Sequence, residues 1–212
     1  LAIAVSALSS VSFFIDRIQA GIRDEAAHLL GADMVIVSDR EFDSVWLNQA
    51  KKYGLARAET RIFPTMVLSG KGGETVAKLV SLKAVSENYP LRGAVRIAGE
   101  ENDPGKKAAT IPGAGTVWAD PELLREAGIR PDDRVRIGNG FFRVTQRIVT
   151  EPDRGISFIH FAPRIMMSLL DLEKTGLVQP ASRVSYRLLL AGNEKDIERY
   201  RKWAEERIKA VS

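Results

Sequence analysis

The chain has 212 residues, 45% of them apolar, which is enough for one large domain or two small ones with a buried core. Its 31 basic and 27 acidic residues give a net charge of +4, and the absence of a long basic run or a stacked aromatic platform argues against nucleic-acid binding. Cysteine is absent, so disulfides, thiolate catalysis and cysteine-based zinc sites are excluded. Only two histidines are present, His28 and His160, and their distance in sequence argues against a histidine-rich metal site.

The first 15 residues carry no charge, and the charged chain begins abruptly at Asp16. Taken alone, this run allows a signal-peptide remnant, a buried core helix or a membrane anchor. It is shorter than the roughly 20 residues that a spanning helix needs, and no initiating methionine or basic stretch precedes it. We expect residues 1–30 to be the end of a transmembrane helix that continues as an amphipathic stalk and stops at Gly31, in a chain cut from a longer protein.

Beyond Gly31 the pattern predicts strand, helix, strand and strand. The predicted elements are a strand at 33–37, a helix capped by Asp43 or Ser44 and ended by Gly54, a strand at 55–69 that Pro64 kinks or shifts to a sheet edge, a turn at 71–74 and a strand at 75–85. The matching pieces come much later, as a helix at 163–174 and a strand at 182–190. The resulting order, βαββ, insertion, αβ, predicts an α+β fold of the ferredoxin-like split βαβ (porter) type.

The insertion, residues 88–162, reads as a small β-rich subdomain. Its predicted elements are a polar loop at 96–115, a strand at 116–119, a helix capped by Asp120 with Pro121 at its first position, a hairpin turning at Gly138-Asn139-Gly140 and an extended piece at 158–161. The insertion therefore divides the predicted porter-like subdomain into residues 31–87 and 163–191.

Residues 192–212 predict a terminal helix capped by Asn193, with apolar residues spaced by three or four. No glycine or proline stops this helix before Ser212, so we expect it to continue back into the membrane. The two terminal helices would then form a paired stalk under one globular body.

Motifs for chemistry are weak throughout. Gly70 to Gly73 lacks the spacing of a phosphate-binding loop and is better explained as a hairpin turn, and Gly113 to Gly115 as a flexible connector. No nucleophile elbow occurs, and both histidines are better explained as structural. Acidic groups that could work in pairs all lie in predicted turns or loops, namely Asp132, Asp133, Glu100, Glu101 and Asp103. We therefore predict no enzyme activity, and no catalytic, cofactor-binding or metal-binding residue is assigned.

Apolar side chains of the insertion are the remaining candidates for ligand contact. They could line an apolar surface or form the core of the insertion itself, and the second interpretation is favoured for each of Trp118, Phe141, Phe142, Phe158 and Phe161. Met166 and Met167 indicate adaptable packing. The sequence does not identify the residues that bind a substrate.

In their order, several short segments resemble the MacB-like periplasmic core domain of FtsX-type ABC transporter permeases. The segments that carry this resemblance are 29–33, 80–85, 89–93, 120–124, 132–138 and 141–144. Residues 151–155 and 176–184 are similar to the YbbP-like branch of that family. The resemblance covers nearly the whole chain.

The resemblance implies a domain lifted into the periplasm by two stalk helices of a homodimeric inner-membrane permease. It also implies a cytoplasmic ABC ATPase partner, whose ATP hydrolysis drives motion outside the membrane. The YbbP-like branch is associated with hydrophobic compounds and with a periplasmic lipase or thioesterase. We therefore expect the domain to bind or guide a hydrophobic substrate (lipid, lipoprotein or toxic compound) and to relay motion. The alternative is a scaffold or signalling module that docks and regulates a soluble hydrolase and transports nothing.

Overall fold

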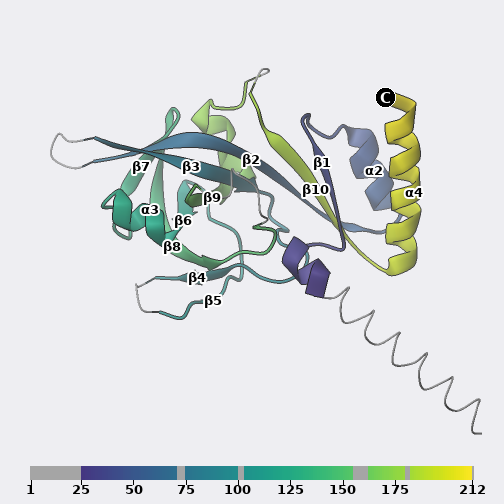
Figure 1. The fold of residues 1–212 in the computed structure, drawn as a ribbon, viewed down its shortest axis with the longest axis horizontal. Coiled ribbons are helices and arrows are strands. Elements are labelled where there is room, and N and C mark those ends of the chain that lie inside the picture. Colours follow the sequence, from purple (N-terminus) through teal and green to yellow (C-terminus); the bar gives the residue numbers. More distant parts are fainter. Residues whose placement is uncertain (1–24, 71–74, 100–102, 155–161, 180–181, 212) are drawn as a thin grey trace, which may run out of the picture.

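The computed structural model describes residues 25–70, 75–99, 103–154, 162–179 and 182–211 (Figure 1). Within these ranges, ten strands form one continuous mixed sheet. The strands are β1 (Met34–Ser38), β2 (Ala56–Ser69), β3 (Val76–Val85), β4 (Arg96–Ala98), β5 (Lys106–Lys107), β6 (Thr116–Ala119), β7 (Arg134–Ile137), β8 (Gly140–Thr150), β9 (Arg164–Ser168) and β10 (Ser185–Ala191). The helices are a helical segment at 25–30, α2 (Ser44–Lys52), α3 (Pro121–Glu126) and α4 (Glu194–Val211).

Six of the strands close into a barrel. The pairing runs from β2 through β3, β9, β6, β8 and β7, and β7 pairs back onto β2 at Val67 and Leu68. Its interior is apolar, with Leu82, Ile137 and Phe142 among the buried side chains. Because a closed sheet of this size is filled by its own side chains, this barrel is a packed core.

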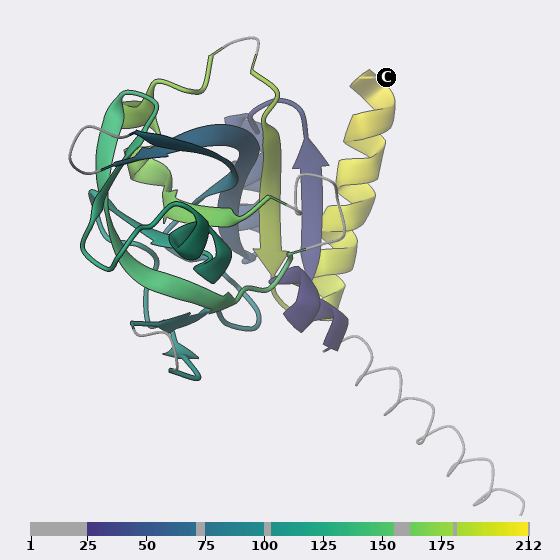
Figure 2. The same cartoon turned by 60° about the vertical axis from the view of Figure 1, so that its left-hand side comes forward.

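A second layer lies beside the barrel. β10 and β1 extend the sheet from β2, and α2 and α4 pack against them on one face (Figure 2). The two helices contact each other through an aromatic cluster in which the rings of Trp46 and Trp203 lie 5.2 Å apart in an edge-to-face arrangement. The β4–β5 ribbon extends from β8 on the other side. The two longer helices, α2 and α4, therefore cover the β1–β10 layer, whereas the short α3 packs against the barrel.

One predicted helix is wrong. Residues 163–174 form β9 followed by two short 3₁₀ turns, Leu169–Asp171 and Glu173–Thr175. β9 is paired on both edges, with β3 in parallel and with β6 in antiparallel orientation, and every one of its residues is buried. A strand buried on both faces gives a continuous apolar run instead of an alternating one, and such a run is easily mistaken for a helix.

The fold is α+β, as predicted, but its arrangement differs from the split βαβ pattern. The second helix of the sheet layer, α4, follows the last strand instead of preceding it. Strands from the ranges 31–87 and 163–191 share the barrel with strands from the range 88–162. The division of the chain into a porter-like part and an inserted part stays a prediction, and its boundaries fall within one continuous sheet.

Several local predictions are confirmed. Asp43 caps α2 by accepting from the backbone N–H of Val45 at 2.9 Å, and Asn193 accepts from Asp196 at the start of α4. Gly31 ends the first helix with a φ of +71°. Pro64 lies where β2 has left β10 and has not yet reached β7, so its missing N–H costs no ladder hydrogen bond.

The terminal helix does not stand apart as a free stalk. Its first three turns pack on the sheet through Ile197, Tyr200 and Ala204. The helical segment at 25–30 lies near the start of α4, whereas the C-terminal end of α4 lies at the opposite end of that helix (Figures 1 and 2). The predicted membrane-embedded run at 1–15 lies outside the described residues. Across the described ranges, no helix has both the length and the apolar character to cross a membrane.

Candidate functional site

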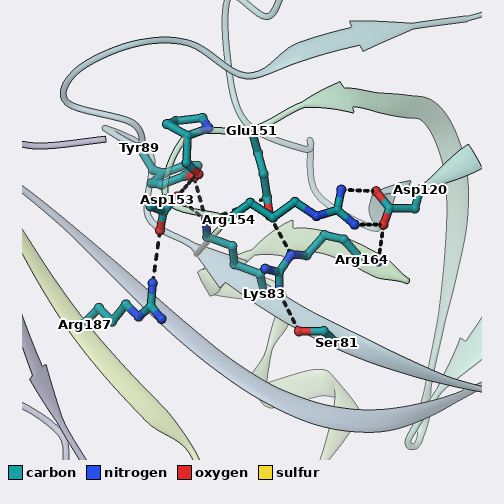
Figure 3. Close-up of polar contacts among 10 residues, drawn as sticks. Ser81, Lys83, Tyr89, Asp120, Glu151, Asp153, Arg154, Arg164 and Arg187 are labelled. Atoms are coloured by element: carbon teal, nitrogen blue, oxygen red, sulfur yellow. Dashed lines mark hydrogen bonds and ion pairs between the residues drawn. The ribbon is translucent and has the colours of Figure 1, made fainter. Parts of the chain in front are cut away.

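A network of charged side chains is buried where the barrel meets the sheet layer (Figure 3). Lys83 of β3 and Arg164 of β9 are both almost completely inaccessible to solvent, although cations of this length normally stay exposed. We define the buried charge network as Ser81, Lys83, Tyr89, Asp120, Glu151, Asp153, Arg154, Arg164 and Arg187. Its members come from β3, β9, β10 and three connecting segments.

Lys83 is at the centre of one half of the network. Its Nζ donates to the Tyr89 hydroxyl at 2.6 Å and to the Asp153 carboxylate at 2.6 Å, and lies 3.7 Å from Oε2 of Glu151. Tyr89 in turn donates to Asp153. Burial, followed by the negative charges of Asp153 and Glu151, raises the pKa of Tyr89 well above its ordinary value, so this phenol is neutral. Lys83 is therefore held by two acceptors and two negative charges.

Arg164 organises the other half. Its Nε donates to Glu151 at 2.8 Å and its Nη1 donates to the hydroxyl of Ser81 on β3. Burial raises the pKa of Glu151, but the positive charges of Lys83 and Arg164 outweigh that effect and hold the pKa below its ordinary value. Glu151 is thus an ionised carboxylate shared by two buried cations.

Asp120 links the network to α3. The sequence predicts Asp120 as a helix cap, and it does occupy that position, but its side chain makes no capping hydrogen bond. The carboxylate instead accepts from both terminal nitrogens of Arg154 and from the backbone N–H of Arg164 at 2.6 Å. Such bidentate pairs fix orientation as well as charge.

The loop from Glu151 to Arg154 also holds the end of the first helix. The N–H of Asp153 donates to the carbonyl of Leu29, and its carboxylate contacts Arg187 of β10 at 3.4 Å. The Gly31 carbonyl accepts from the N–H groups of Leu91 and Arg92, both at 2.9 Å. We call residues 29–31 the helix base. Asp153 therefore joins the helix base, through its backbone, to the buried charges of the barrel, through its side chain.

A further hydrogen-bonded link fixes the strand that follows the helix base. The guanidinium of Arg92 donates to both oxygens of Asp33, at 2.9 and 2.7 Å. Asp33 also accepts from the N–H of Gly192, at the entrance to α4. The helix base, β1 and the start of α4 are therefore tied to the same segment that carries Tyr89.

The arrangement is suited to holding elements together. The cations Lys83, Arg154, Arg164 and Arg187 each form an ion pair with Asp120, Glu151 or Asp153. No cluster of metal-ligating side chains occurs in the part of the chain that the structure describes. The absence of catalytic activity stays a prediction.

The candidate residues named from the sequence lie in separate parts of the structure. Asp132 is at a turn with a φ of +68° and pairs with Arg143, and His28 is exposed on the first helix. Trp118, Phe142, Met166 and Met167 are buried in the core, while Phe141 is exposed. A cavity of about 360 Å³ between Tyr89 and the β4–β5 ribbon has Trp118 and Met166 in its wall. The candidates at 100–101 and 158–161, including His160, lie outside the described residues.

The sequence does not predict this network, because no spacing rule connects its members. Its hydrogen-bonded pairs are up to 83 residues apart in sequence and meet only after β3, β9 and β10 are assembled. The resemblance of residues 151–155 to the YbbP-like branch was the one available signal, since that segment holds Glu151, Asp153 and Arg154.

Comparison with known proteins identifies the family of this chain. A scan against known protein families gave no match. The uncharacterized ABC transporter permease YbbP of Escherichia coli (strain K12) is 33% identical over 203 residues, which is 96% of this chain. The chain belongs to the family of ABC transporter permeases that includes YbbP. It spans 24% of the length of YbbP.

Two solved structures are similar to this chain at low sequence identity. The periplasmic region of MacB from Actinobacillus actinomycetemcomitans has a TM-score of 0.49 and 10% identity, covering 87% of this chain and 86% of that one. The extracellular domain of the noncanonic ABC-type transporter YknZ from Gram-positive bacteria has the same TM-score and identity, covering 75% and 78%.

Proposed function

We propose that this domain binds or guides a hydrophobic substrate and relays ATP-driven motion in a bacterial inner-membrane permease. The permease would act as a homodimer with a cytoplasmic ABC ATPase, and this domain would lie in the periplasm. The relay follows from the way that the helix base is attached to the rest of the molecule.

The single observation that carries the proposal is the bonding of Asp153. Its backbone holds the helix base at Leu29, and its buried carboxylate holds Lys83 of the barrel and Arg187 of the sheet layer. Buried charges that lose a partner are costly, so a displacement of the helix base pulls on both layers together. A surface ion pair would yield instead, because its net stabilisation is small.

The proposal predicts that Arg187→Gln uncouples ATP hydrolysis from substrate movement. The substitution removes the contact between β10 and Asp153 and leaves the hydrogen bonds of Lys83 in place. In the complete permease with its ATPase, reconstituted in vesicles, we expect hydrolysis to continue while the substrate moved per ATP falls severalfold. Lysophospholipid extraction from the vesicles is a suitable measurement.

The matched control is Arg201→Gln on the exposed side of α4, where the arginine pairs only with Glu198 in the described structure. Equal transport by both variants would contradict the relay. A stable complex with a periplasmic lipase or thioesterase, together with unchanged lipid movement in every variant, would favour the scaffold alternative.

A further inference from the structure

The outer face of the barrel carries large apolar side chains where a sheet normally turns polar residues to water. Met66, Leu79 and Phe141 are 45%, 56% and 63% exposed, although they lie within or next to regular strand pairs. We define the arginine-rimmed face as Met66, Leu68, Leu79, Arg134, Arg136 and Phe141. Leu79 of this face is exposed, whereas Ser81 and Lys83 of the buried charge network, further along the same strand, are fully buried.

The strand register makes this face continuous. Met66 lies directly opposite Leu79, and Leu68 opposite Arg136, which is itself opposite Phe141. Directly opposed side chains on antiparallel strands project to the same side, and so do residues two apart on one strand. An apolar row therefore crosses β3, β2 and β8, and arginines of β7 interrupt it.

The charged residues that belong to this face, Arg134 and Arg136, are both basic. Arg134 and Arg136 are exposed, and neither makes a hydrogen bond or ion pair within the described residues. They line a hollow of about 260 Å³ with Leu68 and Phe141, and none of the described residues in its wall is acidic. Asp132, in the turn before β7, pairs with Arg143 of β8. Among the described residues, the hollow therefore combines two guanidinium groups that have no acidic partner with apolar walls.

We propose that the arginine-rimmed face binds an anionic, single-chain amphiphile. Its headgroup would bind to Arg134 and Arg136, since guanidinium groups pair with phosphate or carboxylate oxygens. Its alkyl chain would lie over Phe141, Leu68 and Met66 and remove them from water. This inference rests on the proposed function, because it names the place and charge of the hydrophobic substrate.

The test uses dodecyl phosphate below its micelle concentration and follows methionine methyl resonances by NMR. The chain has four methionines, so Met66 is a local reporter on this face, whereas Met166 and Met167 are buried in the core. We expect a saturable shift of the Met66 methyl alone. Arg134→Gln/Arg136→Gln should weaken it at least tenfold, and Arg40→Gln, at an exposed site elsewhere, should leave it unchanged.

Two comparison ligands test the headgroup contact and the alkyl-chain contact separately. Inorganic phosphate and dodecyl maltoside should each bind at least tenfold more weakly than dodecyl phosphate, because each lacks one half of the contact. Equal binding of either ligand would overturn the proposal, as would equal binding by the double variant. A Met66 shift that depends on protein concentration without any ligand would identify the face as an interface between copies and would also overturn it.

The same variants separate this inference from the relay. If the double variant loses dodecyl phosphate but the complete permease that carries it still moves lipid normally, the assignment of this face as the substrate site is overturned and the relay stands. If dodecyl phosphate binds as predicted but Arg187→Gln leaves transport unchanged, the site stands and the relay is refuted.

Discussion

At the scale of single residues, Glu151 shows how buried charge stabilises this domain. The carboxylate is ionised although it is fully buried, since Lys83 and Arg164 are both within reach. One of its oxygens, Oε2, has no hydrogen-bond partner among the described residues and lies 3.7 Å from the Nζ of Lys83. Removing the charge of Glu151 therefore leaves two buried cations poorly compensated.

Glu151→Gln should lower the free energy of unfolding by about 3 kcal/mol at pH 7. The pKa of Glu151 is lower in the folded protein than its ordinary value of 4.5. Its contribution is thus present above that value and is lost as the pH falls through the lowered folded-state pKa. Urea unfolding at a series of pH values should show the difference between wild type and variant shrinking below pH 4.5.

The control for this prediction is Glu126→Gln, because Glu126 pairs with Lys78 at the surface. Its effect should stay below about 1 kcal/mol, as expected for an exposed pair. A Glu151→Gln effect as small as that of the control would show that the buried network contributes little to stability.

At the scale of elements, helix caps and turns can be predicted from the local sequence, whereas strand pairing cannot. Asp43, Asn193 and the Gly138-Asn139 turn could be predicted because each acts on neighbours within a few residues. The strand β9 could not, because its apolar run is decided by β3 and β6, which flank it in space. Pairing between β2 and β7, which closes the barrel, likewise involves only two residue pairs far apart in sequence.

The packing of α4 yields a prediction at this scale. Ile197 is buried against the sheet, whereas Ile208 on the same helix is 50% exposed. Ile197→Ala should lower the free energy of unfolding by about 3 kcal/mol and weaken the near-ultraviolet circular dichroism of the Trp46–Trp203 pair. The matched variant Ile208→Ala should change both only slightly. Similar losses in the two variants would contradict the packed position of the helix.

At the scale of the whole molecule, the order of short sequence segments indicates the family. It does not indicate how the helix base is connected to the two layers of the domain. Residues 151–155 pointed to the YbbP-like branch, but nothing in their spacing showed that Asp153 reaches both Lys83 and Arg187. A buried network unites charges from separate elements, so it exists only once those elements are assembled. The central claim is that Asp153 fastens the helix base to both layers of the domain.

Native-state hydrogen exchange of Asp153→Asn tests this claim most directly. The N–H groups of Leu91 and Arg92 report on the helix base, because both donate to the carbonyl of Gly31. The account predicts that these amides exchange at least tenfold faster in the variant, while amides of β6 and β8 keep their protection relative to global unfolding. Unchanged exchange at Leu91 and Arg92, or an equal loss across the whole domain, would contradict it.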